Sequence, residues 1–374
     1  TGGYSATSDN TALTVNPLPT ITTAATAAAT CFSSSAQNST LSYSATTNTP
    51  TNYTITWNAA ALAAGFVNLG STALPATPMT LPIAANVAAG TYTGTVTVTN
   101  ASGCASAGNS FTVTINPLPT ITTAATAATR CFSSSAQNST LTYSATTNSP
   151  TTYTVTWNAA ALAAGLVNLS STALPATPIT FSIAANVAAG IYTGTVRVTN
   201  ANGCTGTGSN FTLTINGLPT ISTAATAAAR CFNAVAQNAT LTYSATTNTP
   251  TTYTITWNAA ALSAGLVNVS STALPASPIA VPIAAGVAAG TYTGTVTVSN
   301  ANGCVSTGTS FTITINPLPT VTISPNYCIG GGVVRLTCSA QTSYLWSTGA
   351  TIPVSYTHLR AHETKANLVC RLLL

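Results

Sequence analysis

A block of one hundred residues occurs three times in succession in this chain, in register and without a gap. The spacing is set by a tryptophan and two cysteines: Trp57, Trp157 and Trp257; Cys31, Cys131 and Cys231; Cys104, Cys204 and Cys304. Solenoid repeats are roughly 20–50 residues long, whereas a unit of this length is the size of a complete small domain. The sequence therefore predicts three similar domains in tandem, at residues 17–116, 117–216 and 217–316.

The two ends of the chain differ from the repeats. Residues 1–16 end in Thr11-Ala-Leu-Thr-Val-Asn16, which aligns with Phe111-Thr-Val-Thr-Ile-Asn116 at the close of repeat 1. We interpret them as the last strand of a preceding domain. Residues 317–352 begin a different module that is too short to complete a sandwich. We interpret residues 353–374 as a translated adapter scar that is not native protein; the alternative is a genuine basic amphipathic tail.

Apolar and polar residues alternate along five segments of repeat 1, which is typical of strands with one buried face. The outward positions are mostly threonine, a β-branched polar residue that suits a solvated strand face. A short helical turn is expected at 58–65, where Asn58 can cap a run of alanines that ends at Gly65. The five strand segments are Leu41–Ala45, Tyr53–Trp57, Leu81–Ile83, Tyr92–Val98 and Phe111–Ile115.

A central tryptophan and a tyrosine early in the penultimate strand add to this pattern. About seven short strands with these two aromatics match an immunoglobulin-like sandwich. Because they are in phase with the inward residues of their strands, we expect six aromatic side chains to anchor the cores: Trp57, Trp157, Trp257, Tyr92, Tyr192 and Tyr292. The alternative is that these tryptophans and tyrosines are exposed platforms for a sugar ring.

Charged side chains are almost absent from the repeats. Between Asp9 and His358 the chain contains no Asp, Glu, His or Lys. General acid–base catalysis needs a side chain that exchanges a proton near pH 7, and hydrolytic triads need a histidine with a carboxylate. Calcium, magnesium and most zinc sites are built from carboxylates or imidazoles. The sequence therefore predicts no enzyme activity, no catalytic residues, no metal site and no cofactor in the repeats.

The net charge of +5 does not indicate a nucleic-acid or membrane partner. Three of the seven basic residues, Arg360, Lys365 and Arg371, lie beyond residue 353. Binding to phosphates uses clustered Lys and Arg, and the repeats contain only scattered arginines. Their apolar stretches are short and interrupted by polar residues, glycine or proline, unlike a membrane span. We expect neither nucleic-acid binding nor membrane insertion by this segment.

Each repeat contains two cysteines, and this number in an exported domain indicates disulfides. The simplest pairing joins Cys31 to Cys104 within one repeat. However, bonded cysteines need Cα atoms within about 7 Å, and an immunoglobulin-like strand order puts these two at opposite poles. A staggered bond such as Cys31–Cys204, and unpaired thiols, therefore stay open as alternatives. The disulfide candidates are Cys31, Cys104, Cys131, Cys204, Cys231 and Cys304; no partner is predicted for Cys328 or Cys338.

The connections between repeats are short and rich in proline, as in Asn116-Pro-Leu-Pro-Thr120; Gly217 replaces the first proline of the next one. Proline restricts φ and favours an extended backbone. A connection of this length is too short to act as a flexible tether. We therefore expect the domains to be arranged as an extended rod.

Three strings of repeat 1, at 53–65, 73–76 and 89–100, resemble the PKD-like repeats of large secreted proteins from gliding and related bacteria of the Bacteroidota. The match extends over all three repeats without gaps. The module at 317–352 resembles another Ig-like module of the same proteins, through Cys328-Ile-Gly-Gly and Tyr344-Leu-Trp-Ser-Thr-Gly-Ala350. The resemblance implies export, often by type IX secretion, and an extracellular or cell-surface location. It implies no ligand and no catalytic residue.

These observations predict an all-β chain of tandem immunoglobulin/PKD-like β-sandwich domains, each with one short helical turn. The expected function is a non-catalytic structural or adhesive stalk segment of a large secreted bacterial surface protein. Its partner would be a surface ligand, either a glycan or another protein. The rival function is a carbohydrate-binding sandwich array appended to a secreted hydrolase that lies outside this segment. Buried tryptophans favour the stalk, and an exposed row of aromatics favours the rival.

Overall fold

The computed structural model describes residues 14–318 and, beyond them, only five strands. These are β28 (Ile323–Asn326), β29 (Val333–Cys338), β30 (Leu345–Trp346), β31 (Val354–His358) and β32 (Cys370–Arg371). The chain divides into two compact units, Thr1–Gly217 with the first two repeats and Leu218–Leu374 with the third. The interpretations of residues 1–13, and of most of 319–374, lie outside the described residues.

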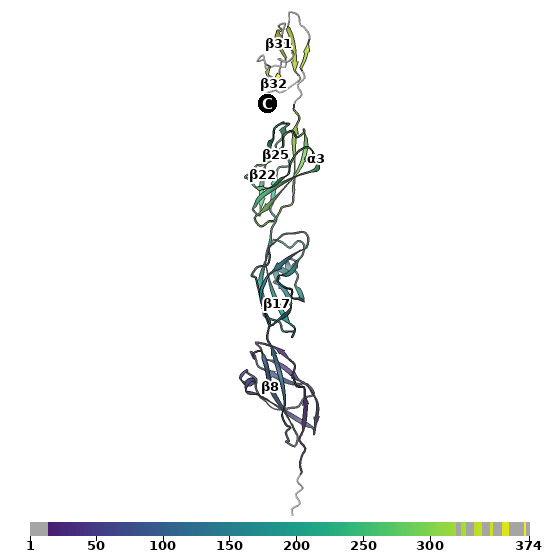
Figure 1. Ribbon diagram of the computed structural model, residues 1–374, viewed down its shortest axis with the longest axis vertical. Helices are drawn as coiled ribbons and strands as arrows, with labels where there is room; N and C mark the ends of the chain where they lie inside the picture. The colour runs from purple at the N-terminus through teal and green to yellow at the C-terminus, as the bar shows by residue number, and fades with distance from the viewer. Residues whose placement is uncertain are drawn as a thin grey trace, which may run out of the picture. The chain divides into compact units, whose positions relative to one another are not determined.

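The three repeats have the same succession of elements (Figure 1). Repeat 1 contains β1 (Thr20–Thr23), β2 (Thr30–Cys31), β3 (Gln37–Leu41), β4 (Tyr43–Thr47), β5 (Pro50–Trp57), α1 (Ala59–Ala63), β6 (Leu69–Ala73), β7 (Met79–Ile83), β8 (Gly90–Asn100) and β9 (Asn109–Asn116). Repeat 2 contains β10 (Thr120–Thr123), β11 (Arg130–Cys131), β12 (Gln137–Leu141), β13 (Tyr143–Thr147), β14 (Pro150–Trp157), α2 (Ala159–Ala163), β15 (Leu169–Ala173), β16 (Ile179–Ile183), β17 (Gly190–Asn200) and β18 (Ser209–Asn216). Repeat 3 contains β19 (Thr220–Thr223), β20 (Arg230–Cys231), β21 (Gln237–Leu241), β22 (Tyr243–Thr247), β23 (Pro250–Trp257), α3 (Ala259–Ser263), β24 (Val269–Ala273), β25 (Ile279–Ile283), β26 (Gly290–Asn300) and β27 (Thr309–Asn316).

Each repeat folds as two packed β-layers. In repeat 1 the larger layer is a five-stranded sheet with the order β2-β9-β8-β5-β6. The second layer contains β1, which pairs with β4, and β3, which pairs with β7. Since only Ser42 separates β3 from β4, the two act as one long bent strand between β1 and β7. This strand order is that of an immunoglobulin-like sandwich, and it recurs in repeats 2 and 3. The predicted all-β tandem sandwich is confirmed.

A separate hydrophobic core lies between the two layers of every repeat. In repeat 1 the larger layer contributes Val96, Val98 and Phe111, and the smaller layer contributes Leu41 and Leu81, all at most 1% exposed. Successive side chains of a strand point to opposite faces, so the threonines between the buried valines of β8 are directed outward. Each repeat therefore buries its own apolar face without help from its neighbour.

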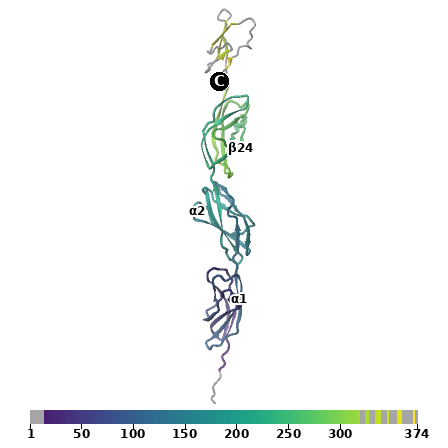
Figure 2. The same cartoon turned by 90° about the vertical axis from the view of Figure 1, so that its left-hand side faces the viewer.

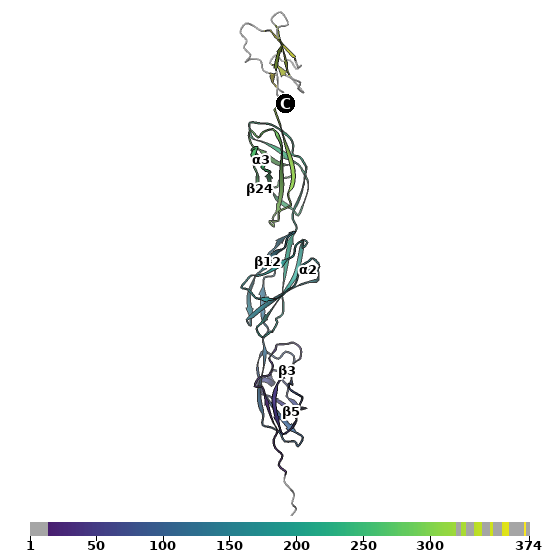
Figure 3. The same ribbon diagram turned by 90° about the vertical axis from the view of Figure 1, so that its right-hand side faces the viewer.

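The predicted helical turn is present in every repeat. α1 begins after Asn58, whose side-chain Oδ1 accepts a hydrogen bond of 2.8 Å from Ala61 N. It ends before Gly65, which has the positive φ of +105° that favours glycine. The turn lies against β5 and β8, and α2 and α3 occupy the equivalent positions of their repeats (Figures 2 and 3).

The six predicted anchor residues lie at or close to the cores. The three tryptophans are 6–7% exposed, and Tyr192 is 8% exposed, whereas Tyr92 and Tyr292 are half-buried. In each repeat the tyrosine hydroxyl donates to the carbonyl four residues upstream; for Tyr192 the acceptor is Ala188 O at 2.8 Å. A tyrosine at the start of this strand that bonds back to the preceding corner is a hallmark of immunoglobulin-like sandwiches.

The segment Leu41–Ala45 departs from the predicted alternation. Leu41 is fully buried, but Tyr43 is half-buried and Ala45 is exposed, because the strand breaks at Ser42 and its pairing with β1 shifts register between Thr22 and Thr23. A bulge of this kind changes which face a side chain occupies. The Tyr43 hydroxyl instead donates to Pro75 O at 2.7 Å, at the edge of the sandwich.

We expect the stability of the repeats to be independent of pH in acid and to decrease only in alkali. Residues 14–318 contain no carboxylate or imidazole side chain, so no side chain there takes up protons between pH 3 and pH 7. Burial raises the pKa of Tyr53, Tyr153 and Tyr253 above the usual value of 10.0. The folded state therefore favours the neutral phenol, and this contribution is present below pH 10 and lost as the pH rises further.

Calorimetry at pH 3, 7 and 11 checks this prediction. The repeats should melt at the same temperature at pH 3 and pH 7, and at a lower temperature at pH 11. A melting temperature that decreases by several degrees at pH 3 would contradict it.

Candidate functional site at the joint between repeats 1 and 2

The first cysteine of repeat 1 is held beside the last strand of the same repeat. The short strand β2 runs parallel to the end of β9, with Thr30 opposite Ile115 and Cys31 opposite Asn116. Phe32 N donates to Asn116 O at 2.9 Å, and Gln37 Nε2 donates to Cys31 O at 2.7 Å. Cys31 therefore lies where the chain leaves repeat 1 for repeat 2.

The second cysteine of repeat 2 lies in the loop between β17 and β18. Asn200 closes this loop, because its Oδ1 accepts from Asn202 N and from Cys204 N, both at 3.1 Å. The Asn200 backbone N–H also donates to Cys204 O at 3.1 Å. Gly203 between them has a φ of +77° that suits glycine in such a turn. The loop therefore holds Cys204 in one position, where it is completely buried.

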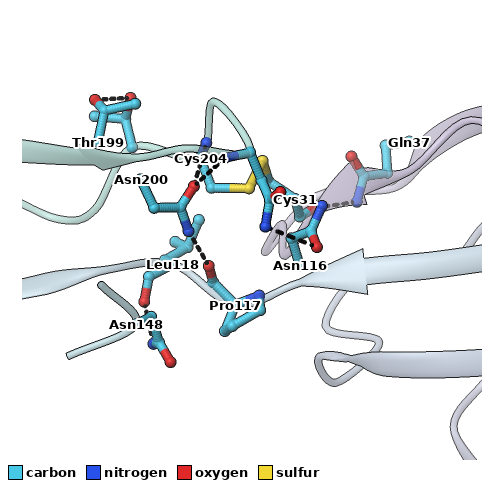
Figure 4. Close-up of a disulfide and its surroundings, with 11 residues drawn as sticks. Cys31, Gln37, Asn116, Pro117, Leu118, Asn148, Thr199, Asn200 and Cys204 are labelled. Carbon is cyan, nitrogen blue, oxygen red and sulfur yellow. Dashed lines mark hydrogen bonds between the residues drawn. A yellow bond between two sulfur atoms is a disulfide. The ribbon is translucent and has the colours of Figure 1, made fainter. Parts of the chain in front are cut away.

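Cys31 and Cys204 form a disulfide between repeats 1 and 2, shown in Figure 4. Their Cα atoms are 5.5 Å apart, although 173 residues separate them in sequence. The within-repeat pairing of Cys31 with Cys104 is therefore wrong. The physical reason is that β9 lies between the two positions: Cys31 faces its last residue, Asn116, whereas Cys104 precedes its first, Asn109. A strand of that length spans roughly 23 Å at 3.3 Å per residue.

The linker itself is bound by asparagine side chains of repeat 2. Asn200 Nδ2 donates to Pro117 O at 3.3 Å, and Asn148 Nδ2 donates to Leu118 O at 2.7 Å. Figure 4 shows both asparagines directed toward the linker. Because proline has no N–H, the linker carbonyls are the main groups that can be held here. The disulfide and these two hydrogen bonds fix the linker to repeat 2.

The loop of repeat 2 also lies against the linker. A Cβ placed on Gly206 would be only 1.9 Å from Pro119 O, so glycine permits this close approach. Asn202 Nδ2 from the same loop donates to Asn116 Oδ1 at 3.3 Å, which connects the loop to the last strand of repeat 1. We refer to residues 116–119, the loop 201–208 and the Cys31–Cys204 bond together as the joint.

The remaining candidate cysteines fall into two groups. Cys131 and Cys304 are disulfide-bonded. Cys104, which is half-buried, and Cys231, which is exposed, carry free thiols. Cys131 and Cys231 occupy the position of Cys31, each opposite the final asparagine of its own repeat. The parallel pairing that positions Cys31 is therefore a property of all three repeats.

The sequence did not single out the asparagines that complete the joint. Asn148 has a positive φ of +53°, and its equivalents Asn48 and Asn248 have φ values of +52° and +53°. Each donates to the leucine carbonyl of its own linker at 2.7 Å. The signal was the Asn-Thr-Pro or Asn-Ser-Pro string, whose proline is the first residue of β5, β14 and β23. Asparagine tolerates the left-handed region better than most residues, so this string could have been assigned to a turn.

Within the residues that the structure describes, no three His, Cys, Asp or Glu side chains come together in a group that could hold a metal ion. Among the described helices, none is long and apolar enough to cross a membrane.

No protein-family model matches the sequence, and no curated protein matches it. Among solved structures, the chain is similar to the fibronectin(III)-like modules of CbhA from Clostridium thermocellum, with 15% identity, a TM-score of 0.31 and coverage of 54% of this chain and 95% of that one. It is also similar to the FN1–FN3 domains of chicken CNTN1, with 10% identity, a TM-score of 0.31 and coverage of 78% and 99%. A third similar structure is the sialic acid binding region of an adhesin from Streptococcus sanguinis SK1, with 15% identity, a TM-score of 0.24 and coverage of 94% and 100%. At these TM-scores the fold assignment rests on the strand order of the repeats themselves.

Proposed function

We propose that this chain is a non-catalytic stalk segment of an extracellular surface protein, in which successive sandwich domains are locked to each other to transmit mechanical load. The observation that carries the proposal is the Cys31–Cys204 disulfide, which joins two domains that each have their own core. Neither domain needs this bond to complete its hydrophobic core. What the bond supports is therefore the connection between the domains.

An extracellular location agrees with this use of cysteine. Disulfides persist in oxidising environments and are rare where thiols are kept reduced. The proposed setting is a large secreted or cell-surface protein of the PKD-like type that the sequence resembles, exported in the manner of the Bacteroidota proteins. In that setting the domain boundaries follow the sequence repeats, at 17–116, 117–216 and 217–316. A glycan or another protein would be bound by a different part of such a protein.

The rival function, a carbohydrate-binding array, has weaker support. Its binding surface would need exposed aromatic rings to stack on sugars, but Trp57, Trp157 and Trp257 are buried. A hollow of about 300 Å³ on repeat 3 is lined by aliphatic and amide side chains around Val267 and Pro282, with no aromatic ring among them. The repeats thus support a spacing and load-bearing role better than recognition of a sugar.

The proposal predicts that the disulfide restricts motion between repeats 1 and 2. With a fluorescent donor on repeat 1 and an acceptor on repeat 2 of the full chain, single-molecule energy transfer should give one narrow distance distribution. In the Cys31→Ser/Cys204→Ser variant we expect a broader distribution, because the two asparagine hydrogen bonds to the linker contribute only about 1 kcal/mol each.

Cys104→Ser is the matched control, since Cys104 forms no disulfide, and it should leave the distribution unchanged. If the double variant keeps the narrow distribution of the native chain, the bond is not what holds the joint.

A further inference from the structure

The N-terminal pole of repeat 1 has the same arrangement as the pole of repeat 2 that receives the disulfide. Asn100 Nδ2 donates to Pro17 O at 3.3 Å, and Asn48 Nδ2 donates to Leu18 O at 2.7 Å. Asn200 and Asn148 make the equivalent contacts, at the same distances, to Pro117 and Leu118. Repeat 1 therefore already makes, around residues 16–18, the contacts that repeat 2 makes to the linker in the joint.

The same pole of repeat 1 also carries an unpaired thiol. Cys104 lies in the loop equivalent to that of Cys204, and the same asparagine contact holds it, with Asn100 Oδ1 accepting from Cys104 N at 3.0 Å. Its sulfur lies 3.9 Å from Asn16 O, so it faces the residue that precedes the linker. Whereas Cys204 is completely buried in its disulfide, Cys104 is half-buried and free.

A second observation is that apolar residues at this pole are not covered by any part of residues 14–318. Val15 aligns with Ile115, the residue opposite Thr30 in the parallel pair that positions Cys31. Ile115 is 1% exposed inside repeat 1, and Ile215 is 2% exposed inside repeat 2, but Val15 is 81% exposed. Leu18, on the linker itself, is also 60% exposed. Among residues 14–318, therefore, no sandwich surrounds this apolar residue of a last strand.

We propose that the N-terminal pole of repeat 1 is a docking surface for a β-sandwich domain whose last strand runs into Val15–Asn16, and that a cysteine of this domain forms a disulfide with Cys104. The partner cysteine lies on a short strand parallel to Val15–Asn16, as Cys31 lies beside Ile115–Asn116. This inference rests on the proposed function, because it extends the same locked joint to a further domain.

The covalent step is an ordinary thiol oxidation. The S–H bonds of Cys104 and of the partner cysteine break, one S–S bond forms, and two protons and two electrons leave the pair. The oxidant is a disulfide compound, such as oxidised glutathione, which takes up both protons and both electrons and becomes two thiols.

The test replaces residues 1–16 of the full chain with a second copy of residues 17–116, whose final asparagine then takes the place of Asn16; this added copy carries Cys104→Ser, so that the Cys104 peptide comes from the original repeat 1 alone. The extended chain is refolded in a buffer of reduced and oxidised glutathione, treated with a thiol-alkylating reagent, digested and mapped by mass spectrometry. We expect the added copy of Cys31 to be bonded to Cys104, and alkylation of Cys104 to decrease from nearly complete in the original chain to below about one-tenth.

The matched control carries Cys31→Ser in the added copy only, and there Cys104 should again be alkylated. The native Cys31–Cys204 bond shows in both chains whether repeats 1 and 2 have folded. If that bond forms while Cys104 stays reduced in the extended chain, this inference is wrong. If the Cys31–Cys204 bond itself does not form, the proposed function is wrong, and with it the basis of this inference.

Disulfide mapping of the protein isolated from the organism that makes it gives an independent answer. A Cys104 peptide linked to a peptide from outside residues 1–374 would support the inference. A free Cys104 thiol, or a bond from Cys104 to any cysteine within residues 1–374, would overturn it.

Discussion

Pulled between residues 14 and 217, the native chain should extend by about 600 Å less than a variant without the Cys31–Cys204 bond. The bond connects two positions that are 173 residues apart, and an unfolded chain reaches roughly 3.3–3.6 Å per residue. In the native chain the force passes from Cys31 through the sulfurs to Cys204. Most of both sandwiches therefore lies outside the path of the force and cannot be drawn out.

The measurement is single-molecule force spectroscopy on the full chain, with handles attached at Thr14 and Gly217 by a chemistry that does not use cysteine. The Cys31→Ser/Cys204→Ser variant should show the additional contour length of about 600 Å, released as the two sandwiches unfold. Cys104→Ser, which removes an unbonded cysteine, should behave as the native chain does. Equal contour lengths for the native chain and the double variant would show that the bond does not carry the load.

The consequence for a stalk is that unfolding of its first two domains releases only a small part of their sequence. An unbonded array of sandwiches yields under load, because each domain that unfolds releases its whole sequence. Here the part of the chain that yields within the first two repeats is limited to the segments before Cys31 and after Cys204. The hydrogen bonds of Asn148 and Asn200 to the linker hold the joint in place when there is no load.

The elements that the sequence predicted well are those with a local signal. Alternation at period two located the strands that contain Trp57, Val96 and Phe111, and the asparagine-alanine-glycine pattern located α1. These features depend on residues that are close in sequence, so one repeat contains all the information that is needed. Among the strands that were missed, β2 has only two residues, which are too few for a pattern, and β6 is almost wholly exposed.

The pairing of the cysteines could not be predicted with the same certainty. It depends on which pole of the sandwich each cysteine occupies, and that is set by the parallel contact of β2 with the end of β9. The topological objection to the Cys31–Cys104 pair was sound, since the strand β9 separates the two positions. The short parallel strand that decides the matter has no signature in the sequence beyond the cysteine itself.

The second large effect is expected from Trp157→Ala, which should destabilise repeat 2 by about 3–5 kcal/mol. The Trp157 ring is 6% exposed and packs with ring centroids 5.3 Å from Phe211 and 5.4 Å from Phe181. A Cβ on Gly194 would lie 3.0 Å from the Trp157 ring, so glycine leaves the space that the indole fills. Removing the indole opens a cavity among rings that cannot close over it.

Such a loss is a large part of the roughly 5–15 kcal/mol that stabilises a typical domain. Because repeats 1 and 3 have cores of their own, their stability should stay the same. Hydrogen exchange with mass spectrometry separates the repeats, and only the peptides of repeat 2 should lose protection. Val167→Ala is the matched control, since Val167 is 72% exposed and its truncation should cost less than about 0.5 kcal/mol. A Trp157→Ala protein that keeps full protection in repeat 2 would mean that the tryptophan belongs to a surface, where it could stack on a sugar after all.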